Sequence, residues 1–313
     1  MYVSHFGLRH RPFRSSPDPT CYYPAGPQEE ALETLQRALA DGDGFAIVTG
    51  EPGVGKTLLA TILLDRHSDD CVCVFVTNSH LTRRADLLQA ILFDLGRPYE
   101  GKSEQELRLA VTETVLASFA EEKQTLLVID EAHHLPADLL EELRLLGNLE
   151  TRHGKAVQIV LVAQPEILDT LKRPELRALS QRITARAEIG RLGLTDAADY
   201  LVHHLRLAGA RPDSILPDEP LAMLAKASGG IPRLLNQSAH LSLSVACQAG
   251  NGRVDAEAVL ESLQRLGLDL PAEEAEEPTA EPTEVPEPQG WRQGMYPLPP
   301  VPPRLVFAPG KSG

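Results

Sequence analysis

The chain has 313 residues, a formal net charge of −14, 42% hydrophobic residues and only 4% aromatic residues. This length is sufficient for one large or two medium domains, and the apolar content is ordinary for a globular core. The acidic charge argues against a protein that coats nucleic acid by bulk attraction, although it does not exclude a local basic patch.

The sequence shows no sign of membrane insertion or export. No apolar run approaches the roughly 20 residues of a membrane span, and the polar, Pro-rich N-terminus has no apolar signal-peptide stretch. The few cysteines do not form a CxxC pair and fit a reducing compartment. We therefore expect a cytoplasmic protein without a membrane span.

Residues 1–26 carry no regular pattern, and we expect an irregular N-terminal segment that aromatic side chains anchor to the rest of the protein. The expected anchors are Phe6, Phe13, Tyr22 and Tyr23.

Strand-like and helix-like segments then alternate through residues 27–193. The expected strands cover residues 45–50, 71–77, 125–130, 156–164 and 183–190. The expected helices cover residues 27–40, 56–67, 82–95, 103–120 and 136–150. Several strands are continuously apolar, which is typical of a parallel sheet covered on both faces. This order predicts an α/β fold with a three-layer α/β/α parallel sheet and right-handed crossovers.

The strand pattern stops after residue 193, and residues 194–268 predict a helical lid domain of three or four helices. The expected helices cover residues 195–208, 217–228, 231–249 and 255–266, with Thr195 and Asp255 as N-caps. Residues 269–313 are rich in Pro and Glu. Because such a segment buries too little apolar surface to fold, we expect a disordered tail.

The first chemical motif is GEPGVGKT, which runs from Gly50 to Thr57 and matches the pattern GxxxxGK[ST] in full. It lies between an expected strand and an expected helix, where backbone N–H groups and the helix N-terminus can surround phosphates. We expect Lys56 to reach the β- and γ-phosphates of ATP and the Thr57 hydroxyl to bind Mg²⁺. The predicted cofactor-binding residues are Gly50, Glu51, Pro52, Gly53, Val54, Gly55, Lys56, Thr57 and Leu58.

The second motif, LLVIDEAHH, places Asp130 and Glu131 at the end of an apolar strand. A carboxylate at this position beside a phosphate-binding loop holds Mg²⁺ directly or through water, and we assign this role to Asp130. Glu131 can orient the attacking water and accept its proton. The next residues include His133 and His134, and since adjacent helical residues do not face one metal ion, we expect no metal site there.

Three further polar residues are candidates for catalytic roles, each with a simpler alternative. Gln164 ends a buried strand and can contact the γ-phosphate or the attacking water, unless it only faces solvent. One of Arg177, Arg182 and Arg186, for which we choose Arg182, can complete the site of a neighbouring subunit, unless it is a solvated surface residue. Arg233, in the first turn of a lid helix, can report nucleotide state by closing the lid, unless it only caps that helix.

Read in order, these motifs resemble the ExeA/GspA type of AAA+ ATPase over about residues 1–266. The matching segments are FGLRHRPF, EALETLQRALADGDGFAIVTGEPGVGKT, LLVIDEAHHLPADLLEELRLLGNLE, LVAQPEILDTL, LSQRITARAEIGRL and GGIPRLLN. The resemblance implies an ATPase domain with a helical lid, in which Gln164 is similar to sensor 1 and Arg233 to sensor 2. Leu58 departs from the Thr that is common in relatives, a change we expect to matter little.

The resemblance leaves two cellular roles open. ATPases of the ExeA type serve secretion or envelope systems through protein partners, but they continue into a transmembrane helix and a peptidoglycan-binding domain. This chain ends in its Pro/Glu-rich tail, so we do not expect it to remodel peptidoglycan. The same module also resembles the transposition regulators of the TniB/TnsC/MuB kind, which assemble on DNA with ATP.

We therefore predict an ATP-hydrolysing, homo-oligomeric switch with a protein partner in a secretion or envelope system. A DNA-binding ATPase that regulates transposition is the alternative. A nucleotide-gated scaffold without hydrolysis is disfavoured, since Glu131 supplies the water-activating carboxylate.

Overall fold

The computed structural model describes residues 2–77, 81–152 and 154–270. The predicted disordered tail lies outside the described residues from residue 271 onward. No helix in the part of the chain that the structure describes is long and apolar enough to cross a membrane.

The centre of the fold is a five-stranded sheet in which every strand is parallel to its neighbours, in the order β2-β3-β6-β1-β7. All five predicted strands are confirmed: β1 is Phe45–Gly50, β2 is Cys71–Val76, β3 is Gln124–Ile129, β6 is Val157–Ala163 and β7 is Ile183–Ile189. Every residue of β1 and β6 is buried, as expected for strands covered on both faces.

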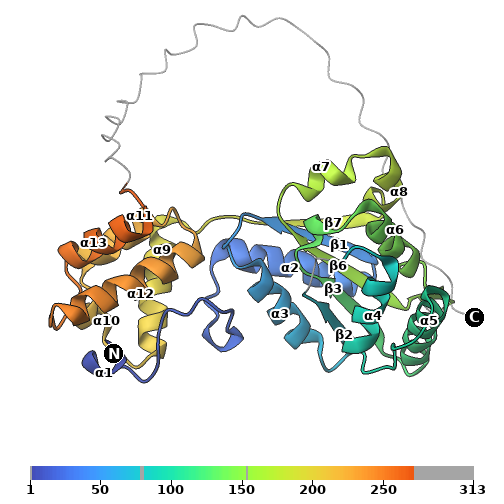
Figure 1. The fold of residues 1–313 in the computed structure, drawn as a ribbon, viewed down its shortest axis with the longest axis horizontal. Helices are drawn as coiled ribbons and strands as arrows, with labels where there is room; N and C mark the ends of the chain where they lie inside the picture. Colours follow the sequence, from blue (N-terminus) through green and yellow to red (C-terminus); the bar gives the residue numbers. More distant parts are fainter. Residues whose placement is uncertain (1, 78–80, 153, 271–313) are drawn as a thin grey trace, which may run out of the picture. The chain divides into compact units, whose positions relative to one another are not determined.

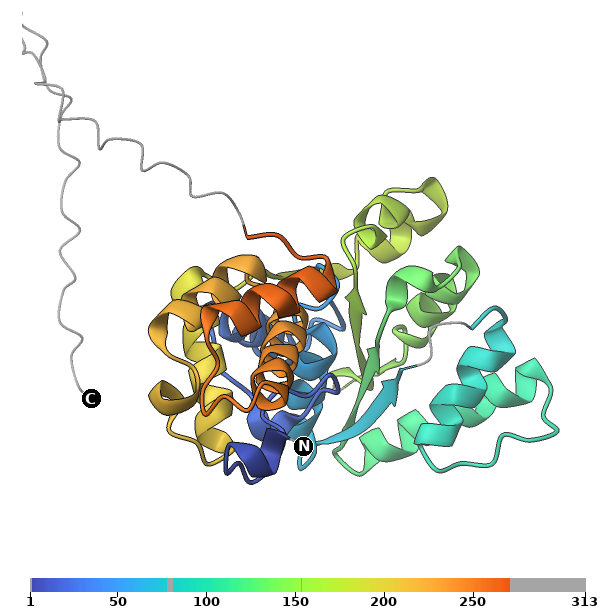
Figure 2. The same cartoon turned by 60° about the vertical axis from the view of Figure 1, so that its left-hand side comes forward.

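Helices cover both faces of this sheet, which gives the predicted three layers (Figures 1 and 2). One face carries α2 (Gly26–Ala40) and α3 (Lys56–His67). The other carries α4 (Arg84–Asp94), α5 (Glu104–Ala120) and α6 (Ala137–Leu146). Alternate residues of each strand enter the two cores, because successive side chains of a strand point to opposite faces.

The strand register places three strand ends at one edge of the sheet. Thr49 of β1 pairs with Ala163 of β6, and Ile129 of β3 pairs with Leu161 of β6. The chain segments that follow β1, β3 and β6 are therefore neighbours. In parallel sheets this carboxyl edge is where ligands bind.

The residues after β7 form a separate helical core, as predicted. Its elements are α9 (Leu194–Leu207), α10 (Pro212–Ile215), α11 (Asp218–Ala227), α12 (Pro232–Gln248) and α13 (Ala256–Leu266). Asp255 is confirmed as an N-cap, since its carboxylate accepts a hydrogen bond from the backbone N–H of Ala258. The prediction for Thr195 is wrong, because Leu194 is already helical and Gly193 is the N-cap of α9.

The N-terminal segment packs largely against this helical core. It contains two short elements, α1 (Tyr2–His5) and the 3₁₀ turn η1 (Pro19–Cys21). Phe13 is buried, and Phe6 and Tyr23 pack beside it, whereas Tyr22 packs against the core between the sheet and α2–α3. The anchoring role predicted for these aromatic residues is confirmed.

Several short elements were not predicted because they are too short to show a period. They are η2 (Ala132–His134), β4 (Glu150–Thr151), β5 (Gly154–Lys155), α7 (Ile167–Leu171) and η3 (Pro174–Leu176), whereas a helix before the last strand was expected and is α8 (Arg177–Ser180). The helix expected over residues 136–150 ends earlier, at Leu146, because Gly147 is its C-cap and Glu150 already belongs to a short hairpin.

Candidate functional site

The loop between β1 and α3 has the backbone conformation that its glycines allow. Gly53 and Gly55 have φ values of 91° and 105°, in the left-handed region where other residues are strained. A Cβ added to Gly53 would lie 2.9 Å from the Cβ of Arg233, so a larger residue would also collide with the lid. This loop leads directly into the N-terminus of α3, an arrangement that favours anions.

Lys56 is the buried cation of this loop. Its side-chain ammonium donates hydrogen bonds to the backbone carbonyls of Gly50 at 2.8 Å and Glu51 at 2.9 Å. Burial lowers the pKa of Lys56, while the nearby carboxylates of Glu131 and Asp130 oppose that shift. The ammonium therefore lies inside the loop, among groups that favour its charged form.

Thr57 and Asp130 are in direct contact. The Thr57 hydroxyl donates to Oδ2 of Asp130 at 2.7 Å, and Oδ1 of Asp130 accepts from the backbone N–H of Glu131 at 2.9 Å. Asp130 is buried, and this burial raises its pKa, while the hydrogen bond from Thr57 lowers it. A hydroxyl and a carboxylate side by side are hard oxygen donors, so these two residues fit Mg²⁺.

Glu131 follows Asp130 in a strained backbone conformation. Its φ of 52° and ψ of 35° lie in the left-handed region, which costs about 1–2 kcal/mol for a residue with a side chain. Its side chain is 37% exposed and lines a cleft at the carboxyl edge of the sheet. Strain of this kind is concentrated at functional sites.

The same cleft brings together residues that are far apart in the sequence. Gln164, which follows β6, and Arg233, in the first turn of α12, both line it with the phosphate-binding loop and Glu131. The backbone N–H of Arg233 donates to the carbonyl of Gly53 at 3.2 Å. Both residues thus lie in the same cleft as the loop and Glu131, and their roles stay predictions.

Arg182 does not join this group. Its guanidinium donates to the backbone carbonyl of Arg144 at 3.3 Å and to the side chain of Asn148, and it does not line the cleft. Within one chain Arg182 therefore has no access to the site.

Sequence reasoning missed the far end of the cleft, which the N-terminal segment and the helical core form together with α2. The additional lining residues are Pro12, Arg14, Ser15, Ser16, Pro17, Asp18, Cys21, Tyr22, Tyr23, Gln28, Tyr200, His204 and Asn236. Burial lowers the pKa of His204 to about 4, so this ring is neutral at pH 7. No local motif marks these residues, because only the fold brings them together.

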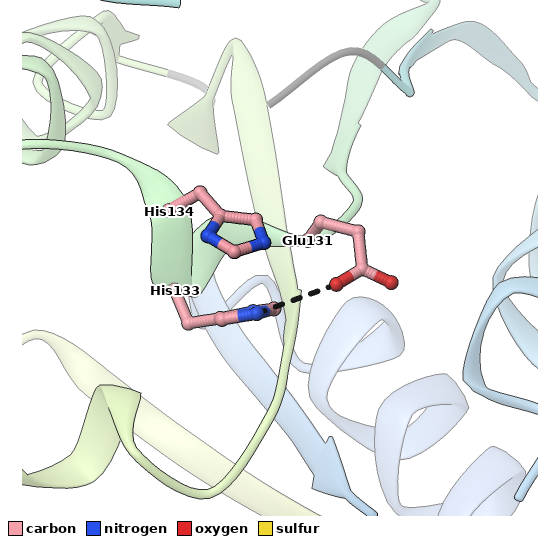
Figure 3. Close-up of side chains that lie close together, drawn as sticks. All are labelled: Glu131, His133 and His134. Atoms are coloured by element: carbon pink, nitrogen blue, oxygen red, sulfur yellow. Dashed lines mark ion pairs between the residues drawn. The ribbon is translucent and has the colours of Figure 1, made fainter. Parts of the chain in front are cut away.

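The two histidines after Glu131 are closer than expected (Figure 3). The ring centroids of His133 and His134 are 4.0 Å apart. Each ring and the Glu131 carboxylate offer a donor atom, and these atoms lie within 4.8 Å of one another. The premise that adjacent histidines point apart is therefore wrong, because a tight 3₁₀ turn carries them.

The fold matches the P-loop fold of AAA+ proteins. Residues 37–171 match the family described as an AAA domain. The structure is similar to Cdc6p from Pyrobaculum aerophilum, with a TM-score of 0.65, 20% identity, and coverage of 84% of this chain and 70% of that chain. It is also similar to the Aeropyrum pernix ORC1 protein in complex with DNA, with a TM-score of 0.65, 21% identity and coverage of 82% and 69%. At these identities the likeness shows the fold alone.

The resemblance to the ExeA/GspA type of AAA+ ATPase is confirmed by sequence comparison. The chain is 38% identical over 255 residues to general secretion pathway protein A of Aeromonas hydrophila, covering 81% of this chain and 46% of that protein. The chain therefore spans about half the length of that relative. It is also 27% identical over 241 residues to the ATP-dependent target DNA activator B of Escherichia phage Mu, covering 76% of this chain and 71% of that protein.

Substitution of Lys56 tests whether the loop binds nucleotide. We expect Lys56→Ala to weaken ATP binding by about 10- to 100-fold, because charge-assisted hydrogen bonds to phosphate are lost. Calorimetric titration with ATP measures the change. Lys172→Ala removes an exposed lysine that pairs only with Asp169, and it serves as the control. Wild-type affinity in Lys56→Ala would show that the phosphates bind elsewhere.

Proposed function

We propose that this chain binds ATP with Mg²⁺ in the cleft, hydrolyses it, and acts as a nucleotide-dependent switch in an assembly. The observation that carries this proposal is the convergence of four parts at one edge of the sheet. These parts are the Lys56 loop, the contact between Thr57 and Asp130, the Glu131 carboxylate and Gln164. The match to the AAA domain supports it.

Each residue has a distinct role in the proposed reaction. Loop N–H groups and Lys56 hold the phosphates, and Thr57 and Asp130 would hold Mg²⁺, which would supply positive charge beside them. Glu131 accepts a proton from the attacking water, and Gln164 orients that water or the γ-phosphate. The aromatic and polar side chains at the far end of the cleft receive the nucleoside.

Arg233 links the nucleotide to the helical core. Its helix contacts the loop through the hydrogen bond to Gly53, so an interaction between the guanidinium and the γ-phosphate would act on α12 directly. Hydrolysis removes that phosphate and with it the interaction. We infer that this change reports the nucleotide state to the rest of the molecule.

Glu131→Gln tests the hydrolytic step. The amide keeps the size of the side chain but accepts no proton, so we expect turnover to fall by about 100-fold or more while ATP affinity is retained. Phosphate release and ATP titration measure the two quantities. The matched control is Glu175→Gln, which changes an exposed glutamate outside the cleft. Normal turnover in Glu131→Gln would remove Glu131 from this role.

The position of Arg182 favours a homo-oligomer. Its guanidinium is bonded to Arg144 of α6 and to Asn148 and lies outside the cleft of its own chain, so a role in hydrolysis would require the nucleotide of a second copy. An arginine supplied in this way stabilises charge on the transferring phosphate. We infer that subunits associate with ATP and that Arg182 completes the neighbouring site.

Mixing two inactive variants tests this arrangement. Arg182→Ala alone is expected to lower turnover by about 1000-fold. When Arg182→Ala is mixed with Glu131→Gln, some sites combine an intact Glu131 with an intact Arg182, and activity should return. Phosphate release from the mixture measures the recovery, and Arg173→Ala, at another exposed arginine, is the control. No recovery would contradict action between subunits.

For the cellular role, we propose a protein partner in a secretion or envelope system, with ATP supplied by the cytoplasm. The 38% identity to general secretion pathway protein A supports this choice. The net charge of −14 also suits a protein partner better than a nucleic acid.

A DNA-binding ATPase that regulates transposition is the second candidate, supported by the relative from phage Mu. The two candidates differ in their response to double-stranded DNA. We expect DNA to leave turnover unchanged, and ATPase rate and particle mass measured with ATP, with and without DNA, check this. Stimulation by DNA that falls steeply with salt would instead indicate phosphate contacts and favour the second candidate.

A further inference from the structure

His133 lies beside the Glu131 carboxylate (Figure 3), and its ring accepts a hydrogen bond from the main chain of Gln164. Its Nε2 lies 3.4 Å from Oε2 of Glu131, and its Nδ1 accepts a hydrogen bond from the backbone N–H of Gln164 at 3.3 Å. The His133 side chain is only 9% exposed. It therefore connects the end of β6 to the carboxylate of Glu131.

The bond from Gln164 determines which ring nitrogen carries the proton. A neutral imidazole has one N–H donor and one acceptor. Because Nδ1 accepts from the main chain, the proton is on Nε2, the nitrogen that lies 3.4 Å from the Glu131 carboxylate. Burial lowers the pKa of His133, with a further lowering from His134, and both effects favour the neutral ring.

The same geometry argues against His133 as a metal ligand. Glu131, His133 and His134 have donor atoms close enough to surround one ion. A metal bound at Nε2 of His133 would require the proton to be on Nδ1, where it would face the N–H of Gln164. Two donors would then oppose each other at a buried position, so the hydrogen bond from Gln164 favours a donor at Nε2.

We propose that His133 is a positioning residue that orients the Glu131 carboxylate for ATP hydrolysis. This inference rests on the proposed function of Glu131. The left-handed backbone fixes the Cα of Glu131, but the long side chain still rotates about its own bonds. A donor from His133 holds one carboxylate oxygen and leaves the other to accept the proton from water. Since the ring is itself bonded to the main chain of Gln164, the Glu131 carboxylate keeps a defined position relative to the end of β6.

Two substitutions separate the contact with Glu131 from the hydrogen bond with Gln164. His133→Asn keeps an acceptor near Nδ1 but does not reach Glu131, whereas His133→Gln places an amide nitrogen near Nε2. We expect His133→Asn to lower kcat by about 10-fold with unchanged ATP affinity, and His133→Gln to recover part of that loss. The control is His67→Asn, which changes a histidine at the C-terminal end of α3, whereas Lys56 begins that helix. Wild-type kcat in His133→Asn would overturn the proposal.

A double substitution distinguishes positioning from a structural role. If His133 acts only through Glu131, then adding His133→Asn to Glu131→Gln causes no further loss of turnover. A further loss of the same size in that background would show that His133 supports the fold instead, and it would overturn the proposal.

The tautomer of His133 can be measured without any turnover. ¹⁵N NMR of the imidazole rings, with the signal of His133 assigned by its absence in His133→Asn, is expected to show protonated Nε2 and unprotonated Nδ1. The opposite tautomer would overturn the proposal. A wild-type protein that shows the expected tautomer but no ATP hydrolysis would contradict the proposed function, so the two failures are distinguishable.

Discussion

The hydrogen bond between Thr57 and Asp130 joins the two motifs on which the site depends. It connects the first turn of α3 to the end of β3, although the two residues are 73 positions apart in the sequence. Asp130 is buried, and burying a carboxylate is costly unless its oxygens find donors. Thr57 and the backbone N–H of Glu131 supply those donors. The same contact therefore holds the two motifs together. It also places side by side the two oxygens that we propose as Mg²⁺ ligands.

The rest of the site follows from the position of β6 between β3 and β1. This order places Gln164 between the phosphate-binding loop and the strained turn at Glu131. His133 can therefore contact both Gln164 and Glu131. The loop in turn contacts the first turn of α12 through Gly53 and Arg233. A change at the phosphates therefore has a continuous route of contacts to the helical core, which is what a nucleotide-dependent switch requires.

Local patterns predicted the sheet and the chemistry of its loops because both are encoded by short, strongly patterned segments. The five strands, the roles of Lys56 and Asp130 as loop cation and strand-end carboxylate, and the cap at Asp255 could all be read from the sequence. The far end of the cleft could not be read, because it is assembled from the N-terminus, α2 and the helical core. The contacts of His133 were missed for a similar reason, since they depend on a 3₁₀ turn and on pairing with β6.

The central claim is that this cleft binds ATP for hydrolysis, and a crystal structure with a non-hydrolysable ATP analogue and Mg²⁺ tests it most directly. In that complex we expect the Lys56 ammonium to exchange the carbonyls of Gly50 and Glu51 for phosphate oxygens, and Thr57 to bind Mg²⁺. We also expect the γ-phosphate to lie beside Glu131 and Gln164. Phosphates bound outside the loop, or a Lys56 still paired with the two carbonyls in the nucleotide complex, would contradict it.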